Sequence, residues 1–191
     1  MEKGITVRKV VISGVLGAIA ILLGVTRLGY IPVPTAAGNA TIMHIPAVIG
    51  GIMEGWPVGM AIGLIFGLSS FLNATSVLFK DPLVAILPRL FIGVTAYFTY
   101  RALKRANPYL AIGVAGFVGS ATNTILVLLM AVLRHYLAFG AAVTVAVVNG
   151  LPEAIVSVIV TLAVVGAWMR LGSGRKSKLS DDDADDAGEG V

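Results

Sequence analysis

The chain has 191 residues, of which 57% are hydrophobic and only 13% are charged, and its formal net charge is +4. This composition lies far outside the range of soluble proteins and predicts an integral membrane protein. Cysteine is absent, which excludes a disulfide framework, a thiolate nucleophile and a cysteine metal site. The basic residues adjoin apolar runs and form no patch interleaved with aromatic residues, so they favour membrane topology over nucleic-acid binding.

The lengths of the apolar runs predict an all-α bundle of six transmembrane helices, because about 20 residues cross ~30 Å of hydrocarbon. The first run has the outline of a signal peptide, but a retained helix is expected because no fitting cleavage site follows it. The second run is only ~20 Å long as a helix, too short to span without tilt or thinning. The expected helices are Val7 to Leu28, Thr41 to Met53, Pro57 to Leu72, Pro82 to Leu103, Tyr109 to Leu133 and Ala141 to Leu171.

Prolines and turn residues mark the breaks between these helices. Pro32 and Pro34 end the first helix, because neither can donate to a helix ladder. The tetrapeptide from Glu54 to Pro57 predicts a tight turn, and Asn107-Pro108 predicts another. Within the fourth helix, Pro88-Arg89 predicts an interruption.

The distribution of the 14 Lys and Arg residues predicts the topology. With a cytoplasmic N-terminus, all but four of these residues fall inside, which satisfies the positive-inside rule. Both termini are therefore expected in the cytoplasm. Residues 172–191 pair a basic stub with an acidic run and lack an apolar face, so they predict a disordered tail after a membrane domain of residues 1–171. The four outer basic residues are Arg27, Lys80, Arg89 and Arg134.

Polar side chains converge on one depth of the predicted bundle. Helical rise places Arg89 and Asn149 ~10 to 12 Å below the outer surface. Asn123 reaches a similar level from the other direction, His44 lies near the outer end of the second helix, and Glu153 lies one turn below Asn149. Polar groups at membrane depth are expensive and are candidates for function, so a ligand site is expected here.

Each of these groups also has a structural interpretation. Arg89 and Glu153 are compatible with an ion pair between helices, and both asparagines with hydrogen bonds that hold helices together. His44 is compatible with a bond to a backbone carbonyl. Glu153 is compatible with a proton carrier, although the sequence offers no second intramembrane carboxylate.

Small residues recur at four-residue spacing in two helices. The third helix carries Gly59, Gly63 and Gly67, and close packing inside the bundle is the default interpretation. In the first helix such a patch also suits docking of a partner. Its members are Ser13, Gly14, Gly17 and Ala18.

No enzyme motif is present in the sequence. It contains no Gly-x-Ser-x-Gly elbow, no His-Glu-x-x-His helix and no Gly-x-x-x-x-Gly-Lys-Ser/Thr loop, so the chain itself is not expected to hydrolyse ATP. Only two histidines occur, His44 and His135, which excludes a histidine-rich metal site. No cofactor is expected.

Two stretches resemble the substrate-binding S components of energy-coupling factor (ECF) vitamin transporters. They read LGYIPVPTAAGNATIMHIPAVIGGIMEGWPVGMAIGLIFGLSSFLNA and LPRLFIGVTAYFTYRAL, and the segment from Asn149 to Glu153 adds to the likeness. The segments ATIMHIPAVIGG and LPRLFIG are most similar to those of family members assigned to pantothenate, and next to those of riboflavin-type members. Arg89 suits a carboxylate, whereas Tyr30, Phe71, Phe79 and Tyr136 offer stacking for riboflavin.

The resemblance implies capture of a vitamin from outside by a multi-pass protein of the prokaryotic plasma membrane. It also implies partners: a transmembrane coupling subunit and two ATPase subunits. Helix one of the family contacts the coupling subunit, here through Gly14 and Ala18 or through Ser13 and Gly17. The alternatives are a self-sufficient proton-coupled carrier that uses Glu153 and a scaffold without a ligand. The substrate-binding candidates are Tyr30, Asn39, His44, Asn73, Arg89, Asn123, Asn149 and Glu153.

Overall fold

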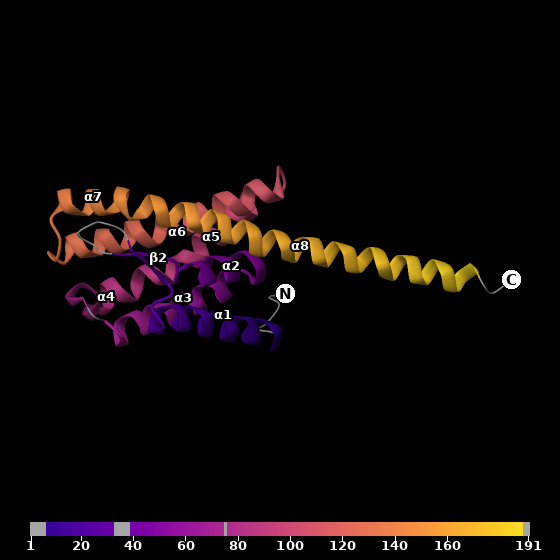
Figure 1. Cartoon of the computed structure of the whole chain (residues 1–191), viewed down its shortest axis with the longest axis horizontal. Coiled ribbons are helices and arrows are strands. Elements are labelled where there is room, and N and C mark those ends of the chain that lie inside the picture. Colours follow the sequence, from indigo (N-terminus) through magenta and orange to yellow (C-terminus); the bar gives the residue numbers. More distant parts are fainter. Residues whose placement is uncertain (1–6, 33–38, 75, 189–191) are drawn as a thin grey trace.

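The computed structural model describes residues 7–32, 39–74 and 76–188, which form a helical bundle with a two-stranded sheet (Figure 1). The elements are α1 Val7–Val25, β1 Tyr30–Pro32, β2 Asn39–Thr41, α2 Ile45–Glu54, α3 Trp56–Leu72, the 3-10 helix η1 Val77–Lys80, α4 Pro82–Ala85, α5 Leu87–Leu103, α6 Pro108–Leu133, α7 Phe139–Val148 and α8 Gly150–Gly188.

The six predicted helical segments are confirmed within the described residues, with α4 and α5 forming the fourth segment and α7 and α8 the sixth. Three segments are long and apolar enough to span a membrane: Pro82–Leu103, Pro108–Leu133 and Phe139–Arg170. Lys9–Val25, Ile45–Glu54 and Trp56–Leu72 are shorter apolar helices.

Two of the long segments are interrupted near the same end of the bundle. The predicted break in the fourth segment is confirmed, since α4 ends before Ile86 and α5 places Pro88 in its first turn. The sixth segment, expected to be continuous, is broken at Asn149. Pro152 explains this break, because a proline lacks an N–H for the carbonyl four residues earlier, that of Val148.

The expectation that the second helix begins at Thr41 is wrong, because residues 39–41 form a strand. β1 and β2 are antiparallel and pair Tyr30 with Thr41, and the Ile42 amide extends the pairing by donating to the Gly29 carbonyl at 2.9 Å. Pro32 has no N–H to donate, which suits the end of an edge strand. The small sheet is an addition to the predicted all-α fold.

The short helix α2 is the centre of the bundle. All residues from Ile45 to Ile52 are buried, and α2 packs against α1, α3, α5, α6 and α8. A helix that is apolar on every side must be enclosed by protein or lipid, and here protein encloses it. The α2 helix therefore does not need the length of a full membrane span.

The glycine row of α3 packs inside the bundle, as expected. A Cβ on Gly59 would lie 2.8 Å from the Gly93 Cα of α5, and one on Gly63 would overlap the Arg89 carbonyl. The missing side chains thus allow α3 and α5 to approach backbone to backbone. This contact fixes the height of Arg89 in the bundle.

At the other end of the bundle, α8 continues as a helix to Gly188 and extends beyond the remaining helices (Figure 1). It thereby runs through most of the segment, residues 172–191, for which the sequence predicts a disordered tail. The division of the chain into a membrane domain and a tail stays a prediction.

Candidate functional site

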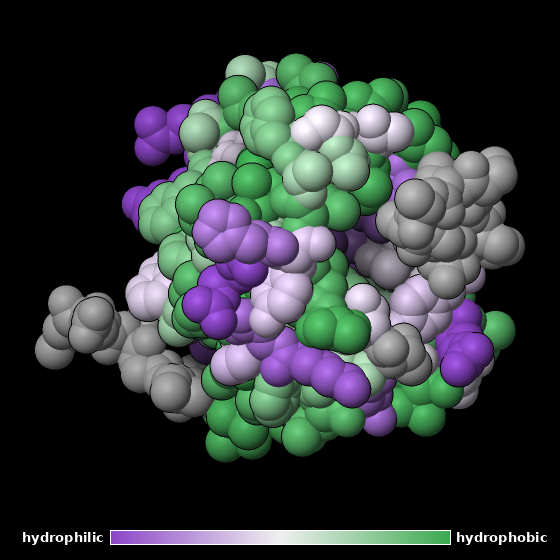
Figure 2. All heavy atoms as spheres, turned by 90° about the vertical axis from the view of Figure 1, so that its left-hand side faces the viewer, coloured by the Kyte–Doolittle hydropathy of each residue, from purple (hydrophilic) through white to green (hydrophobic). Residues whose placement is uncertain are grey.

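A cavity of about 1330 Å³ opens at the end of the bundle that carries the β-sheet, α4 and the start of α7. Ligand pockets commonly measure about 300 to 1,000 Å³, so the space exceeds what a small metabolite fills. Figure 2 looks onto this end and shows hydrophilic residues across its middle beside a hollow, with hydrophobic residues along much of its perimeter. The polar and aromatic lining residues include Arg27, Tyr30, Thr41, Phe66, Asn73, Phe79, Arg89, Asn123, Thr124, Tyr136, Asn149 and Glu153.

Arg89 is the buried cation of this cavity, with only 4% of its surface exposed. Its Nη1 donates to the Val84 carbonyl at 2.5 Å, while its Nε has no partner among the described residues. The guanidinium carbon lies 5.4 Å from the ring centroid of Phe66 and 5.0 Å from that of Phe79. Both distances are within the range of cation–π interactions, so the two rings stabilise the Arg89 guanidinium without using its N–H donors.

The helix break creates the acceptor that Arg89 uses. Pro88 cannot donate to the carbonyl four residues earlier, which is that of Val84. The Arg89 side chain supplies the missing donor. The Pro88-Arg89 pair therefore breaks the helix and compensates for the break at once.

Glu153 is held by two hydrogen bonds rather than by Arg89. The Thr41 amide donates to one carboxylate oxygen at 2.6 Å, and the Thr124 hydroxyl donates to the other at 3.1 Å. Within the described residues no ion pair joins Glu153 to Arg89, although both line the cavity. Of the interpretations left open by the sequence, these contacts favour an anchor between α8, α6 and β2 over an ion pair with Arg89.

The four other candidates whose side chains are described at the cavity differ in exposure. Asn123 and Asn149 are 6% and 4% exposed, and the Asn123 Oδ1 has no partner among the described residues. Asn73 is exposed and donates to the Ser69 carbonyl at 3.0 Å, at the end of α3. Tyr30 lies on β1 and is 38% exposed.

His44 is not brought to the cavity wall, whereas the side chain of Asn39 lies outside the described part of the chain. His44 is fully buried, is absent from the lining residues, and neither ring nitrogen has a partner among the described residues. Its position just before the enclosed helix α2 explains this burial. Asn39 belongs to β2, but its side chain lies outside the described part of the chain, as does that prediction.

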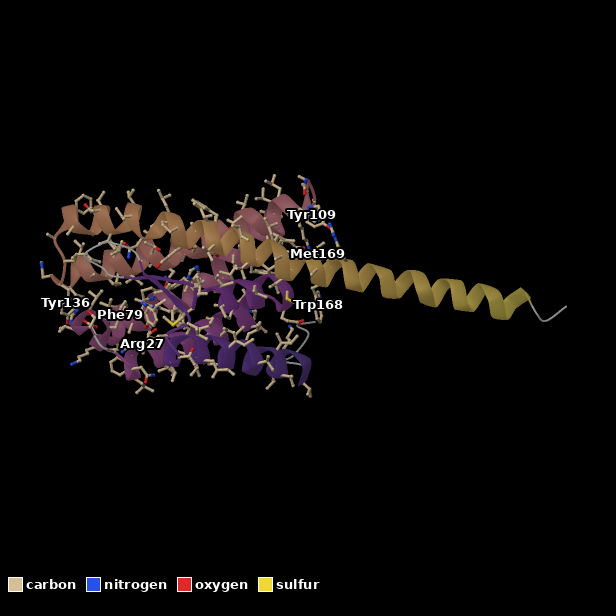
Figure 3. The ribbon with its side chains drawn as sticks, viewed as in Figure 1. Arg27, Phe79, Tyr109, Tyr136, Trp168 and Met169 are labelled. Carbon is tan, nitrogen blue, oxygen red and sulfur yellow. The ribbon has the colours of Figure 1, made fainter. Side chains whose placement is uncertain are left out.

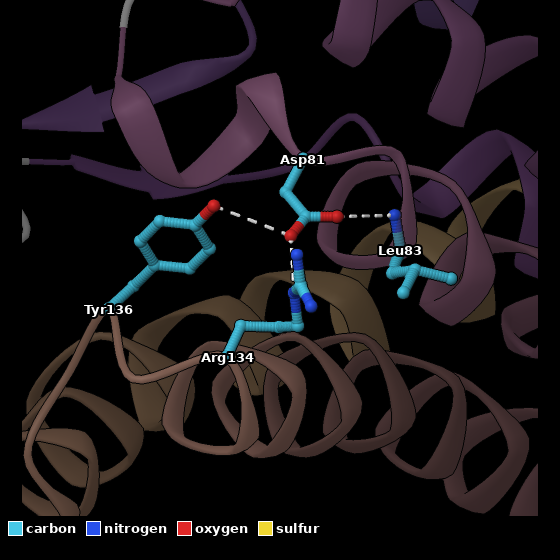
Figure 4. A network of polar contacts seen from close by, with 4 residues as sticks. All are labelled: Asp81, Leu83, Arg134 and Tyr136. Carbon is cyan, nitrogen blue, oxygen red and sulfur yellow. Dashed lines mark hydrogen bonds and ion pairs between the residues drawn. The ribbon is translucent and has the colours of Figure 1, made fainter.

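A polar network lies at the rim of the cavity (Figure 4). Asp81 accepts hydrogen bonds from the Arg134 Nε at 2.7 Å, the Tyr136 hydroxyl at 3.4 Å and the Leu83 amide at 2.9 Å. The Arg134 hydrogen bond is the main cause that lowers the pKa of Asp81. The stabilising effect of the pair is thus present above roughly pH 4 and is lost as the pH falls through the lowered pKa.

Sequence reasoning missed several residues at this end. Arg27 lines the cavity, although in the sequence it stood out only as an outer positive charge in the topology. Its backbone has a positive φ of 60°. Thr41, Thr124 and Phe66 carried no signal beyond their proximity to candidate residues. Figure 3 shows Arg27, Phe79 and Tyr136 at the cavity end, whereas Tyr109, Trp168 and Met169 lie at the opposite end. Aromatic residues thus occur at both ends, as they do at membrane interfaces.

The small residues of α1 face different surroundings. A Cβ on Gly17 would meet the Ile65 side chain of α3 at 2.7 Å, whereas one on Gly14 would meet nothing within 4 Å. The Ser13 hydroxyl is half-buried and donates to the Lys9 carbonyl at 2.8 Å. Gly14 and Ala18 are exposed and lie one turn apart.

Comparisons with known proteins agree with this architecture. Residues 8–165 match the family described as "ECF transporter, substrate-specific component". The pantothenic acid transporter PanT of Lactococcus lactis subsp. cremoris (strain MG1363) is 36% identical over 156 residues, covering 66% of this chain and 76% of that protein.

Solved structures show the same fold. ThiT from Listeria monocytogenes has a TM-score of 0.62 at 18% identity, covering 87% of this chain and 95% of that one. A second structure, described as the S component of a bacterial ECF transporter, has a TM-score of 0.57 at 20% identity, covering 88% and 98%. The family match, which spans most of the chain and includes at least part of every helical segment of the bundle, shows that this protein belongs to the substrate-specific components of ECF transporters.

Proposed function

We propose that this protein captures pantothenate from outside the cell and delivers it to an ECF transporter powered by separate ATPase subunits. The observation that carries the proposal is the buried Arg89 guanidinium, which lines the cavity and whose Nε has no partner among the described residues. A buried cation with a free donor favours an anionic ligand, because a carboxylate supplies both the charge and the acceptors. The 36% identity to a pantothenic acid transporter supports the same substrate.

The chemistry of pantothenate matches the other polar groups of the cavity. The molecule carries a carboxylate at one end, an amide in the middle and two hydroxyls at the other end. Arg89 has the planar donor geometry for the carboxylate. The Asn123 Oδ1, which has no partner among the described residues, is an acceptor for an amide N–H or a hydroxyl. Asn149 lines the same cavity at the helix break.

Glu153 serves as an anchor in this proposal. Both of its carboxylate oxygens accept hydrogen bonds, one from the β2 backbone and one from α6. The bonds fix the strand that borders the cavity. A proton carrier needs a carboxylate that exchanges partners during transport, so these contacts favour the anchoring role over the stand-alone carrier.

The proposal is tested by comparing pantothenate with pantothenol, whose alcohol replaces the carboxylate, in binding to the purified protein. We expect the wild-type protein to prefer pantothenate and Arg89→Gln to lose pantothenate affinity by about 10- to 150-fold, as for hydrogen bonds to a charged group. Pantothenol affinity should change far less. Lys80→Gln is the matched control, because Lys80 is an exposed cation near this end that does not line the cavity.

Failure of the wild-type protein to bind pantothenate, or an equal loss for both ligands in Arg89→Gln, would contradict the proposal. Riboflavin serves as a competitor in the same assay. Of the four aromatic residues considered for riboflavin, Phe79 contacts Arg89 and Phe71 is absent from the lining residues, whereas Tyr30 and Tyr136 line the cavity.

We propose that the cavity end faces outward and that both termini are cytoplasmic. The start of α1 and the turn between α5 and α6 lie toward the opposite end of the bundle (Figure 1). These segments carry Lys9, Arg101, Lys104 and Arg105, which supports this orientation by the positive-inside rule. The coupling subunit and two ATPase subunits are the proposed partners, and uptake by reconstituted vesicles should require all of them. Uptake by this chain alone, driven by a pH gradient, would favour the carrier instead.

Two pairs of small residues on α1 are candidates for the docking face. The pair Gly14 and Ala18 is favoured because both are exposed, whereas Gly17 of the other pair packs on α3. Gly14→Trp should block co-purification with the coupling subunit without changing ligand affinity. Val15→Trp, at an exposed position about 100° around the helix, is the control. If both variants assemble normally, the docking face lies elsewhere.

A further inference from the structure

The segment from Ser76 to Asp81 links the cavity to the rim network. Ser76, Val77, Leu78 and Phe79 line the cavity. Both ends of the segment are capped, since the Ser76 hydroxyl accepts from the Leu78 amide at 3.4 Å and Asp81 accepts from the Leu83 amide at 2.9 Å. The segment is therefore a short shaped strap rather than an extended connection.

A second cavity-lining loop holds this strap from the end of α6. Arg134 caps the C-terminus of α6, and Tyr136 and Leu137 follow it along the cavity. The Arg134 Nε and the Tyr136 hydroxyl both donate to Asp81 Oδ2 (Figure 4). One carboxylate thus ties together two loops that are more than 50 residues apart in sequence.

The Asp81–Arg134 pair suits a positioning role better than a purely stabilising one. The Arg134 side chain is 51% exposed and that of Asp81 is 5% exposed. A half-exposed pair contributes little to the free energy of unfolding. It does fix geometry, because two donors from the loop after α6 and the Leu83 amide of α4 meet on one buried carboxylate.

Phe79 connects the strap to Arg89 in the cavity. Its ring lies in the middle of the strap, with its centroid 5.0 Å from the Arg89 guanidinium carbon. Phe66, the other ring near Arg89, is fixed within α3. The position of Phe79 depends instead on where the strap is held.

We propose that Asp81, Arg134 and Phe79 are positioning residues for ligand binding: the ion pair across the rim holds Phe79 on Arg89 and so presents the guanidinium to an anionic ligand. The inference rests on the proposed function for the identity of the ligand. It predicts that three residues outside the hydrogen-bonding groups of the site determine the preference for a carboxylate.

The first test measures pantothenate and pantothenol binding by Asp81→Asn, Arg134→Gln and the double variant. Asp81→Asn keeps an oxygen for the Leu83 amide, so α4 keeps its cap. We expect each single variant to lose pantothenate affinity roughly 3- to 30-fold, with little change for pantothenol. The double variant should lose no more than either single variant, because each change breaks the same link.

Phe79 provides the conservative comparison. Phe79→Tyr keeps an aromatic face and should retain the preference for the carboxylate, whereas Phe79→Leu should lose it to the same extent as Asp81→Asn. Lys80→Gln, next to Asp81 and exposed, should bind both ligands as the wild-type protein does.

Amide hydrogen exchange, measured without added ligand, tests whether the Asp81–Arg134 pair holds the strap, whatever the substrate is. Exchange at residues 77–83 should accelerate at least threefold in Asp81→Asn and Arg134→Gln and stay unchanged in Lys80→Gln. Unchanged exchange, additive losses in the double variant, or an equal loss for both ligands in Phe79→Leu would each overturn the inference. If the wild-type protein does not bind pantothenate, the proposed function fails, while the exchange rates still decide whether the ion pair holds the strap.

Discussion

At the scale of single residues, the site depends on how a buried charge is compensated. A guanidinium without partners is very costly to bury, and Arg89 meets part of this cost through the Val84 carbonyl and two aromatic rings. The Arg89 Nε has no partner among the described residues, so part of the cost of burial stays uncompensated. In the proposed function an anionic ligand would supply the missing acceptor.

Glu153→Gln tests the anchor at this scale. A glutamine has one neutral acceptor oxygen in place of two charged ones, so the Thr41 amide either loses its acceptor or keeps a weaker one. Hydrogen bonds to charged groups contribute about 1.5 to 3 kcal/mol, so exchange of the Thr41 amide should accelerate about tenfold or more. Hydrogen-exchange measurements on the ligand-free protein provide the readout.

Glu54→Gln is the control and should leave Thr41 exchange unchanged, because Glu54 ends α2 beside Arg101 and Lys104 and does not line the cavity. A normal Thr41 exchange rate in Glu153→Gln would contradict the anchoring role. Loss of pH-gradient-driven uptake by the variant, with uptake present in the wild-type chain alone, would restore the carrier hypothesis.

At the scale of elements, close helix contacts and helix breaks act together. Gly59 and Gly63 bring α3 against the backbone of α5, and the break before α5 places Arg89 at the cavity. A second break, at Asn149, lies on the wall formed by α7 and α8. Polar backbone and side chains at membrane depth are thus gathered where the cavity, rather than lipid, surrounds them.

Gly63→Ala tests the contact between α3 and α5. A Cβ there would overlap the Arg89 carbonyl, and backbone cannot move aside as a flexible side chain does. We expect a loss of about 1 to 3 kcal/mol in the free energy of unfolding, together with weaker ligand binding. Thermal denaturation in detergent and ligand titration measure the two effects.

Gly140→Ala is the matched control, since a Cβ on Gly140 would meet nothing within 4 Å. Within a helix this change should be neutral or stabilising, because alanine has the higher helix propensity. If Gly63→Ala is as stable as Gly140→Ala and binds normally, the close approach does not determine the position of Arg89.

At the scale of the whole molecule, the chain is a binding subunit of an ECF transporter, a multi-pass membrane protein rather than an enzyme. Its cavity opens at one end of the bundle, while the α5–α6 turn and the start of α1 lie toward the other (Figure 1). This polarity, combined with the positions of the basic residues, gives the proposed orientation.

The absence of native cysteine makes this orientation directly testable. Single-cysteine variants Ala138→Cys, beside the cavity, and Ala106→Cys, in the α5–α6 turn, both introduce exposed thiols. In right-side-out vesicles a membrane-impermeant maleimide should label position 138 and should reach position 106 only after permeabilisation. The opposite pattern would invert the topology.

The sequence by itself determined the membrane class, the helical segments and the candidates Arg89, Asn123, Asn149 and Glu153, because apolar length and polar residues at membrane depth are local signals. The tertiary structure decided which groups meet. It enclosed His44, paired Glu153 with Thr41 and Thr124 instead of Arg89, and joined Asp81 to Arg134. These contacts link residues distant in the chain. Prolines mark the helix breaks locally, but the partners follow from how the helices pack, which no local pattern encodes.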